Sequence, residues 1–344
     1  MTVRIGIVGY GLGGRCFHAP FVEAAEGITL SGIVARSPAR IAEARADFPG
    51  VPVFASLGEL VDSGVDAVTI TTPPQTRRDL VLEAIARGVH VVADKPFAPD
   101  VATAREMVVA ADEAGVLLSV FHNRRYDADI RTLRSVLPRL GDMWRVESHF
   151  DQDGANTLEA GPTGGLLRDI GAHVVDQVLW LFGSAERVDA HLDYVDLPEG
   201  RTDAGFVVNI THHNGIYSTL SSSKVNHLEA RRLRAFGSAG SYVSDGTDVQ
   251  AQALFAGKRP IDDLGGWGYE QPDRWGVLHT AEGAEPIPSL PGAYQDFYTE
   301  FAAAVAGTGA QPVPARTALG TIAVLAAARE SAETGRTVAV APTD

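Results

Sequence analysis

Hydrophobic positions in the first 120 residues gather in short, nearly continuous β-branched runs, separated by longer Ala-rich stretches with helical spacing. Such runs are typical of parallel strands buried on both faces, and the intervening helices predict crossover connections. The expected strands are Val3–Val8, Thr29–Val34, Val53–Phe54, Ala67–Ile70, His90–Ala93 and Leu117–Val120, with helices over Thr76–Arg87 and Val101–Ala114. This half predicts an α/β fold with a doubly wound parallel sheet of the Rossmann type.

After Asn123 the pattern changes to strict alternation, which predicts half-buried strands in an open, mostly antiparallel sheet. The alternating segments are Trp144–Phe150, Arg187–Val195, Ala204–His212, Tyr217–Lys224 and Arg231–Phe236. Helices are expected around Tyr126–Leu137, over Tyr294–Ala306 and over Ala315–Glu333. The stretch Ile261–Pro291 shows no period and reads as a surface excursion. We therefore expect a dinucleotide-binding domain at 1–122 and an α+β domain at 123–344.

Composition narrows the possible partners of the chain. The formal net charge is −14 without a basic stripe, so neither nucleic acid nor an anionic membrane surface is an expected partner. No signal peptide is visible, no apolar run approaches the length of a membrane span, and the single cysteine, Cys16, forms no intrachain disulfide. No metal-ligand spacing is present, since His212-His213 and Asp151–Gly154 match neither zinc nor calcium motifs. We expect a cytoplasmic protein that binds a small molecule.

The segment Gly9-Tyr10-Gly11-Leu12-Gly13-Gly14 satisfies G-x-G-x-x-G and falls between the first strand and a helical stretch. The first glycine permits a tight turn, the second lets the backbone approach a pyrophosphate, and the third permits close packing of helix on strand. The alternative is a chance glycine-rich turn in a chain with 36 glycines. Its position favours dinucleotide binding.

The end of the second strand carries no acid to accept a ribose 2′-hydroxyl. Arg36, Ser37 and Arg40 stand there instead, a set of donors suited to a 2′-phosphate. This predicts NADP as cofactor, with NAD possible. The alternative is that both arginines are solvated and that Ser37 only caps a helix.

Two further places carry ionisable groups. Lys95 ends a parallel strand at the edge where α/β sheets bind ligands, although the alternative of a surface lysine is open. Asp169 and His173 have the i, i+4 spacing of one helical face and form a possible acid/base pair near neutral pH. The alternative is an ordinary helix start with His173 in the core.

Together these segments resemble the glucose-fructose oxidoreductase, inositol dehydrogenase and rhizopine-catabolism (Gfo/Idh/MocA) family of NAD(P)-dependent oxidoreductases, over nearly the whole chain. The matching motifs are Gly9-x-Gly11-x-x-Gly14, Thr72-Pro73-Pro74, Asp94-Lys95-Pro96 in place of the family's Glu-Lys-Pro, and Gly164-Gly165 followed by Asp169-x-x-x-His173-x-x-Asp176. Phe17–Pro20, Ser119–Arg125 and Glu147–Asp151 further resemble a subgroup that contains NADP-dependent scyllo-inositol dehydrogenases.

The resemblance implies a Rossmann domain followed by an open sheet whose outer face forms homodimers or homotetramers, with the active site between the two domains. Lys95, Asp169 and His173 would form the catalytic set: His173 as acid/base, Asp169 orienting it, and Lys95 holding the reacting oxygen. Thr72, Pro73 and Lys95 would join the cofactor-binding residues. Asn123 and Arg124 would contact the substrate, together with the catalytic set.

The sequence departs from the family at three places. Arg77 stands where a His is common, Asp94 replaces Glu, and Asp151–Pro162 is shorter than in the scyllo-inositol enzymes. The expected reaction interconverts a secondary alcohol and a ketone, or a lactone, on a sugar, polyol or cyclitol. The alternatives are a non-catalytic sensor that binds NADP(H) and a reductase of a non-sugar carbonyl.

Overall fold

The computed structural model describes residues 2–161 and 164–343, which fall into two compact units. The first unit contains the residues up to Asn123 together with Ala253–Trp267 and Ala293–Leu319. The second contains Arg124–Gln252, Gly268–Gly292 and the residues from Gly320 onward. The chain thus enters the first unit three times, which the hydrophobic pattern does not indicate. The domain boundary between residues 122 and 123 stays a prediction.

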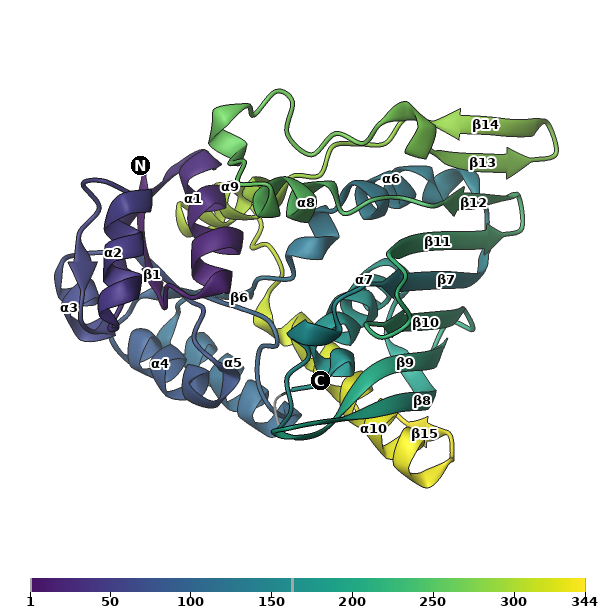
Figure 1. Cartoon of the computed structure of the whole chain (residues 1–344), viewed down its shortest axis with the longest axis horizontal. Helices are drawn as coiled ribbons and strands as arrows, with labels where there is room; N and C mark the ends of the chain where they lie inside the picture. The colour runs from purple at the N-terminus through teal and green to yellow at the C-terminus, as the bar shows by residue number, and fades with distance from the viewer. Residues whose placement is uncertain (1, 162–163, 344) are drawn as a thin grey trace. The chain divides into compact units, whose positions relative to one another are not determined.

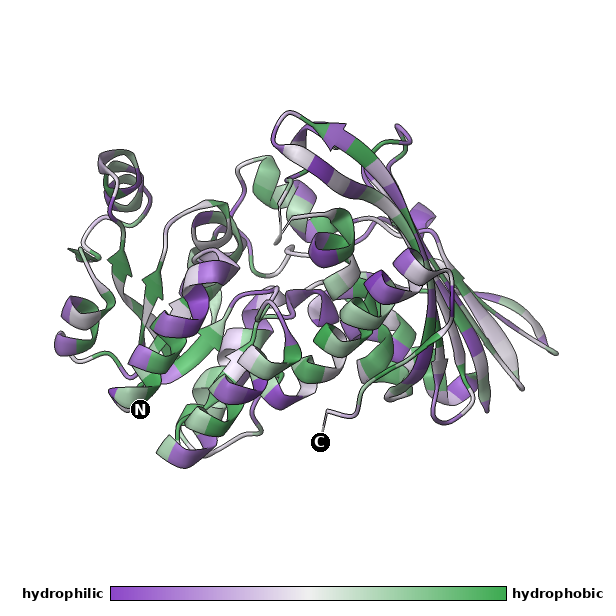
Figure 2. Cartoon of the chain, turned by 90° about the horizontal axis from the view of Figure 1, so that it is seen from below, coloured by the Kyte–Doolittle hydropathy of each residue, from purple (hydrophilic) through white to green (hydrophobic). Residues whose placement is uncertain are grey.

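The first unit is built on a parallel sheet with the strand order β3-β2-β1-β4-β5-β6 (Figure 1). Its strands are β1 Val3–Val8, β2 Ile28–Val34, β3 Val53–Phe54, β4 Ala67–Ile70, β5 His90–Ala93 and β6 Leu118–Val120. Figure 2 shows that these strands are hydrophobic along most of their length. The strand order reverses between β1 and β4, the point at which doubly wound sheets bind ligands. The predicted Rossmann-type sheet is confirmed.

Helices connect most of these strands, and some of them begin at a side-chain cap. They are a π-helical turn at Gly13–His18, then α1 Ala19–Ala24, α2 Pro38–Asp47, α3 Leu57–Asp62, α4 Pro74–Ala86, α5 Val101–Ala114 and, later in the chain, α9 Tyr294–Val305. Ser37 caps α2 and Asp100 caps α5, each by accepting a backbone N–H. Gly115 ends α5 with a φ of +67°.

The second unit is built on a mixed sheet with the order β14-β13-β12-β11-β7-β10-β9-β8-β15 (Figure 1). Its strands are β7 Met143–Asp151, β8 Ala185–Leu197, β9 Gly200–His212, β10 Tyr217–Ser223, β11 Ala230–Gly237, β12 Gly240–Ser244, β13 Gly276–Thr280, β14 Gly283–Ile287 and β15 Val338–Ala339. Among the described residues every neighbouring pair is antiparallel except β7 with β10. The mostly antiparallel sheet is therefore confirmed.

One face of this sheet forms a hydrophobic core with α6 Ala128–Val136, α7 Ala172–Phe182 and the later part of α10 Ala315–Thr334. Leu133, Val175 and Val324 are fully buried there against strand residues such as Phe206 and Leu220. Burying a side chain of this size contributes about 1.5–3 kcal/mol. In the described ranges no helix is both long enough and apolar enough to cross a membrane.

The stretch Ile261–Pro291 differs from the expected excursion without regular structure. Its later part forms the hairpin β13–β14, which extends the sheet beyond β12. The hydrophobic pattern of the sequence does not predict β14, because Ile287 is the one buried residue of this strand and Pro286 interrupts the strand. A proline is tolerated there because β14 is an edge strand. The short helix α8, Val249–Phe255, precedes this stretch.

Candidate active site

The loop Gly9–Gly14 follows β1, and its motif glycines meet three different demands. Gly9 has a φ of +102°, which residues with side chains rarely adopt. A Cβ at Gly14 would lie 2.2 Å from the Gly9 carbonyl oxygen, whereas nothing lies within 4 Å of such a Cβ at Gly11. The backbone at Gly11 is open to a phosphate, so this loop fits a dinucleotide.

The carboxyl ends of β1, β4 and β5 bring three loops to one edge of the sheet. Thr71, after β4, donates its hydroxyl to the Gly9 carbonyl oxygen at 2.8 Å. The Thr72 hydroxyl is buried and has no hydrogen-bond partner among the described residues. The predicted residues Thr72 and Pro73 thus stand at the same edge as the glycine loop, and the orphaned hydroxyl is consistent with a ligand that completes its bonding.

Asp94, directly after β5, lies against the glycine loop. Its Oδ2 is 3.0 Å from where a Cβ on Gly13 would lie, and its Oδ1 accepts the Lys95 N–H at 2.8 Å. His18 Nε2 lies 3.4 Å from the same Oδ1, and His18 Nδ1 lies 2.6 Å from the Tyr298 hydroxyl. Burial raises the pKa of Asp94, but His18, Arg77 and Lys95 outweigh it and hold that pKa below its usual value. Asp94 therefore supplies an anion beside the half-buried Lys95.

Arg77 connects two of these loops. It lies buried in the first turn of α4 and donates to the Thr72 carbonyl oxygen at 2.7 Å and to the Pro96 carbonyl oxygen. Burial lowers the pKa of Arg77, and the charge of Asp94 opposes that effect. The sequence identified Arg77 only as a departure from the family pattern; in the structure it fixes the loops that carry Thr72 and Lys95.

The three residues predicted at the ribose end differ in their availability. Arg36 is exposed and makes no hydrogen bond or ion pair with any residue that the structure describes. The Ser37 hydroxyl accepts the Arg40 N–H at 3.3 Å, and the Arg40 guanidinium donates to Glu43 at 2.6 Å. Of the two arginines, Arg36 is thus the one without an acidic partner among the described residues.

Two other loop residues have contrasting surroundings. The Tyr10 side chain is buried, and its hydroxyl donates to Asp47 Oδ2 at 3.0 Å, which also accepts from Arg15 Nε at 2.6 Å. Burial and the neighbouring Asp47 raise the pKa of Tyr10. Leu12 is 63% exposed. Tyr10 can therefore offer a cofactor its backbone rather than its hydroxyl.

In the second unit, Gly164 and Gly165 let the chain pass close to a backbone carbonyl and a buried carboxylate, respectively. A Cβ at Gly164 would lie 2.2 Å from the Glu159 carbonyl oxygen. Gly165 has a φ of +93°, and its Cβ would lie 2.2 Å from Asp203 Oδ1. Asp203 accepts the Leu167 N–H at 2.6 Å and an Arg329 N–H at 3.0 Å. Gly165 thus leaves room for Asp203 to anchor the start of the next helical segment.

That segment carries Asp169 and His173. Leu167–Gly171 is a π-helical turn that leads into α7, so Asp169 lies in a wider turn than the expected α-helix. His173 is buried in the first turn of α7, whereas the Asp169 side chain is 44% exposed. Asp169 Oδ2 accepts from Lys224 Nζ at 3.0 Å. Sequence reasoning missed Lys224, whose one signal is its place at the end of an alternating segment.

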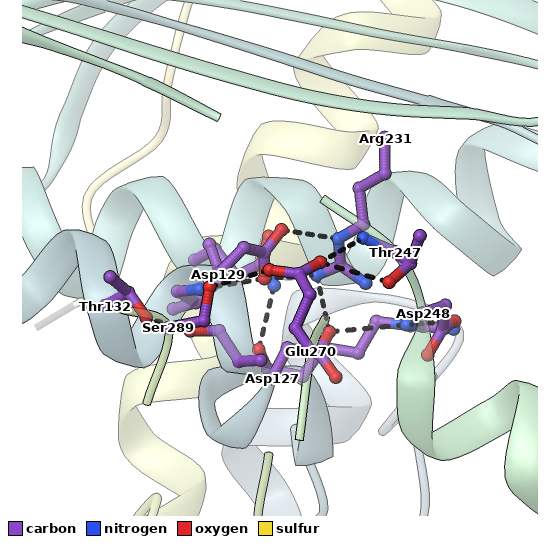
Figure 3. Close-up of polar contacts among 12 residues, drawn as sticks. Asp127, Asp129, Thr132, Arg231, Thr247, Asp248, Glu270 and Ser289 are labelled. Atoms are coloured by element: carbon purple, nitrogen blue, oxygen red, sulfur yellow. Dashed lines mark hydrogen bonds and ion pairs between the residues drawn. The ribbon is translucent and has the colours of Figure 1, made fainter. Parts of the chain in front are cut away.

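Arg124, the predicted substrate contact, belongs to a buried ionic cluster. Figure 3 labels four other members of that cluster: Asp127, Asp129, Arg231 and Asp248. The Arg124 guanidinium lies 2.7 Å from Asp248 and 3.3 Å from Asp127, and Arg231 contacts Asp127 at 2.6 Å and Asp129 at 2.5 Å. Burial raises the pKa of Asp248, but Arg124 and Arg231 outweigh it and hold that pKa below its usual value. The charge of Arg124 is thus balanced within the second unit.

The last acid of the Asp169–Asp176 motif has a structural role. Asp176 forms a buried bidentate pair with Arg125, at 2.8 and 2.6 Å. The adjacent Gln177 donates its amide to the Arg124 carbonyl oxygen at 2.9 Å. These bonds tie α7 to the turn Asn123–Tyr126, where Asn123, the other predicted substrate contact, is also buried.

The sheet order and the glycine loop are those of a Rossmann fold that binds a dinucleotide. Residues 3–122 match the model of the oxidoreductase family with an NAD-binding Rossmann fold (GFO_IDH_MocA), and residues 139–340 match the model of that family's C-terminal α/β domain. The chain belongs to the Gfo/Idh/MocA family of oxidoreductases.

Relatives of this family match the chain over nearly its whole length. It is 34% identical to the uncharacterized oxidoreductase YdgJ of Escherichia coli, covering 99% of each chain. It is 31% identical to the scyllo-inositol 2-dehydrogenase (NADP(+)) IolW of Bacillus subtilis, covering 98% of this chain and 96% of the relative. The solved structure of the YPO2259 protein from Yersinia pestis is 32% identical and aligns with a TM-score of 0.90, covering 99% and 98%.

Proposed function

We propose that the protein is a cytoplasmic NADP(H)-dependent oxidoreductase that interconverts a secondary alcohol and a ketone, or a lactone, on a sugar, polyol or cyclitol. The observation that carries this proposal is the edge formed after β1, β4 and β5, where Asp94, the residue before Lys95, lies against the open glycine loop. The likeness to a scyllo-inositol 2-dehydrogenase supports the substrate class and a place in the same subgroup.

The cofactor would be held by the backbone of Gly9–Gly14, including Tyr10 and Leu12, and by Thr72, Pro73 and Lys95. Arg36, with Ser37 and Arg40 beside it, would bind the 2′-phosphate of NADP. When bound, the dinucleotide supplies the hydride donor or acceptor. NAD lacks the 2′-phosphate and would bind more weakly, because the exposed Arg36 would gain no anionic partner.

His173 would accept the hydroxyl proton as the carbon is oxidised and return it in the reverse direction. Asp169 would orient His173 and contact the substrate, and Lys95 would hold the reacting oxygen. Asn123 and Arg124 would contact the rest of the substrate. Arg124 is held by Asp127 and Asp248, so it would present a fixed guanidinium rather than a mobile one.

We also propose a homodimer or homotetramer formed through the sheet of the second unit. Val207 on β9 and Tyr217 on β10 are exposed at 39% and 42%. Both alternate with buried neighbours, so they stand on the face of the sheet opposite its hydrophobic core. Sedimentation velocity of the purified protein, compared with a Tyr217→Glu variant, tests this assembly.

The test of the reaction begins with fluorescence titration of cofactor-free protein with NADPH and NADH, followed by turnover of a panel of inositols, aldoses and their ketones. His173→Ala is expected to lower turnover by about 10² to 10⁴ while NADPH affinity stays near that of the unaltered protein. His213→Ala, at an exposed histidine, is the control. Unchanged turnover in His173→Ala would refute the assignment, and cofactor binding without any turnover would favour a sensor.

A further inference from the structure

Lys224 is held firmly beside Asp169. It directly follows β10, its N–H donates to the Ala204 carbonyl oxygen at 3.0 Å, and its own carbonyl oxygen accepts from Gly154. The side chain is only 8% exposed, and Nζ donates to Asp169 Oδ2 at 3.0 Å. Of 29 basic residues in the sequence, lysines occur only at positions 95, 224 and 258, so two of the three lysines belong to the proposed site or touch it.

The ammonium of Lys224 has more donors than the fold uses. An ammonium carries three N–H groups, and Asp169 is the one side chain to which Lys224 donates within the part of the chain that the structure describes. A buried charge is expensive unless its remaining donors are satisfied. The other two N–H groups, beside the partly exposed Asp169 carboxylate, have no acceptor among the described residues.

The buried arginine pairs of the same unit are different. Arg125 and Asp176 face each other in a bidentate pair, both almost fully buried. Arg231 spans Asp127 and Asp129 through three hydrogen bonds. Each of those guanidinium groups donates several hydrogen bonds to carboxylates, as expected of structural pairs. Lys224 instead donates a single hydrogen bond to a carboxylate that is partly exposed.

We infer that Lys224 positions Asp169 and binds a substrate oxygen next to the reacting carbon. This inference rests on the proposed function and deepens it, because it assigns the substrate to compounds with neighbouring oxygens: vicinal diols and the corresponding hydroxyketones. The Lys224 ammonium holds the Asp169 carboxylate with one N–H and gives a second N–H to the neighbouring hydroxyl of the substrate. A simple secondary alcohol forgoes that hydrogen bond.

The experiment uses the full-length protein with NADP⁺ and the polyol of an inositol and aldose panel that it turns over fastest. Lys224→Met keeps the apolar stem and removes the charge, and Lys224→Arg restores a donor. Lys224→Met is expected to raise KM for the polyol by about 10- to 100-fold, with a smaller loss of kcat and unchanged NADPH affinity. A deoxy analogue of the same polyol lacks the hydroxyl next to the reacting carbon. For this analogue, Lys224→Met is expected to change KM little. Lys258→Met, at the exposed lysine, is the control.

A second measurement separates positioning from general stability. If Lys224 acts on Asp169, the loss of kcat/KM caused by Lys224→Met is smaller in an Asp169→Asn background, and Lys224→Arg recovers part of it. The inference is overturned if the KM for the polyol is the same in Lys224→Met as in the unaltered protein, or if it rises no more than the KM for the deoxy analogue. A loss of NADPH affinity as large as the rise in KM would overturn it too. Should the unaltered protein bind NADPH but turn over no polyol, the proposed function itself fails.

Discussion

The Arg77 guanidinium donates to the Thr72 carbonyl oxygen at 2.7 Å and also to the Pro96 carbonyl oxygen, so one buried cation joins the loops after β4 and β5. Arg77→Met is expected to lower the free energy of unfolding, at a cost of about 1–3 kcal/mol for each buried carbonyl left without a partner. It should also weaken NADPH binding, because Thr72 and Lys95 lose a common support. Urea unfolding and fluorescence titration measure both effects.

Arg77→Lys serves as the control for that prediction. It retains the charge and can restore one of the two hydrogen bonds, so an intermediate loss is expected. Arg78, the partly exposed neighbour that pairs with Glu106 on the surface, should tolerate substitution by Met with little change in NADPH affinity. Equal NADPH affinity in Arg77→Met and the unaltered protein would contradict the proposed connection.

Arg36 is expected to determine the choice of cofactor. Arg36→Asp should weaken NADPH binding by about 10- to 100-fold, since a charge-assisted hydrogen bond is lost and a repulsive carboxylate is introduced, while NADH binding is retained. Titration at one fixed ionic strength measures the change. Arg40→Ala is expected to have a smaller effect, because Arg40 is already paired with Glu43. Equal affinity of the unaltered protein for NADPH and NADH would exclude a 2′-phosphate site.

Gly165→Ala is expected to disturb the anchoring of the Asp169 turn. The substitution strains a residue with a φ of +93° and forces its Cβ against Asp203, which holds the Leu167 N–H. Gly161→Ala is a matched control, since Gly161 has a φ of +103° but open space around its Cβ. Backbone strain alone costs about 1–2 kcal/mol. Gly165→Ala should therefore lose more stability and more turnover than Gly161→Ala, and equal losses would assign the effect to strain alone.

Asp248 should make stability depend on acid pH. Its pKa in the folded protein lies below its usual value, so its stabilising contribution is present above the unfolded pKa, about 3.9, and is lost as pH falls through the lower folded pKa. At neutral pH, Asp248→Asn should cost about 1.5–3 kcal/mol, because it removes the nearer of the two carboxylates that pair with buried Arg124 and leaves Asp127 at 3.3 Å. Urea unfolding between pH 7 and 3 should show the two proteins converging below about pH 4.

Two comparisons sharpen the Asp248 experiment. Burial raises the pKa of Asp127, which belongs to the same cluster, so its contribution to the pH dependence of stability has the opposite sign to that of Asp248. The effect of Asp248 is therefore measured as the difference in unfolding free energy between Asp248→Asn and the unaltered protein. Asp245→Asn, at an exposed aspartate, should leave stability within about 0.5 kcal/mol at every pH. A gap between Asp248→Asn and the unaltered protein that stays constant down to pH 3 would show that the cluster does not titrate as described.

Much of the fold could be predicted because its signals are local. An apolar run such as Val3–Val8 predicts a buried strand from adjacent residues alone. The Gly9–Gly14 loop predicts a phosphate-binding turn in the same way. The hairpin β13–β14 gave no such signal, since an edge strand needs few buried residues and tolerates Pro286.

The candidate site could be predicted where motif residues act through their own loop, and not where long-range contacts decide. Lys224 meets Asp169 across 55 positions of sequence, and Asp203 meets Leu167 across 36. Neither separation corresponds to the repeat of a helix or a strand, so no sequence pattern indicates these contacts. Arg77 was visible only as a departure from a pattern, because its acceptors are backbone oxygens, which any sequence supplies.

The first unit is assembled from three separate passes of the chain, and this has a consequence for biosynthesis. Tyr298 in α9 contacts both His18 and Thr69, and Gln311 donates its amide to the Leu118 carbonyl oxygen at 2.8 Å. During translation these partners emerge after most of the second unit has been made. The nucleotide-binding unit can therefore complete its core only once residue 319 has left the ribosome, and a fragment that stops at Asn123 would expose the buried surfaces that α9 covers.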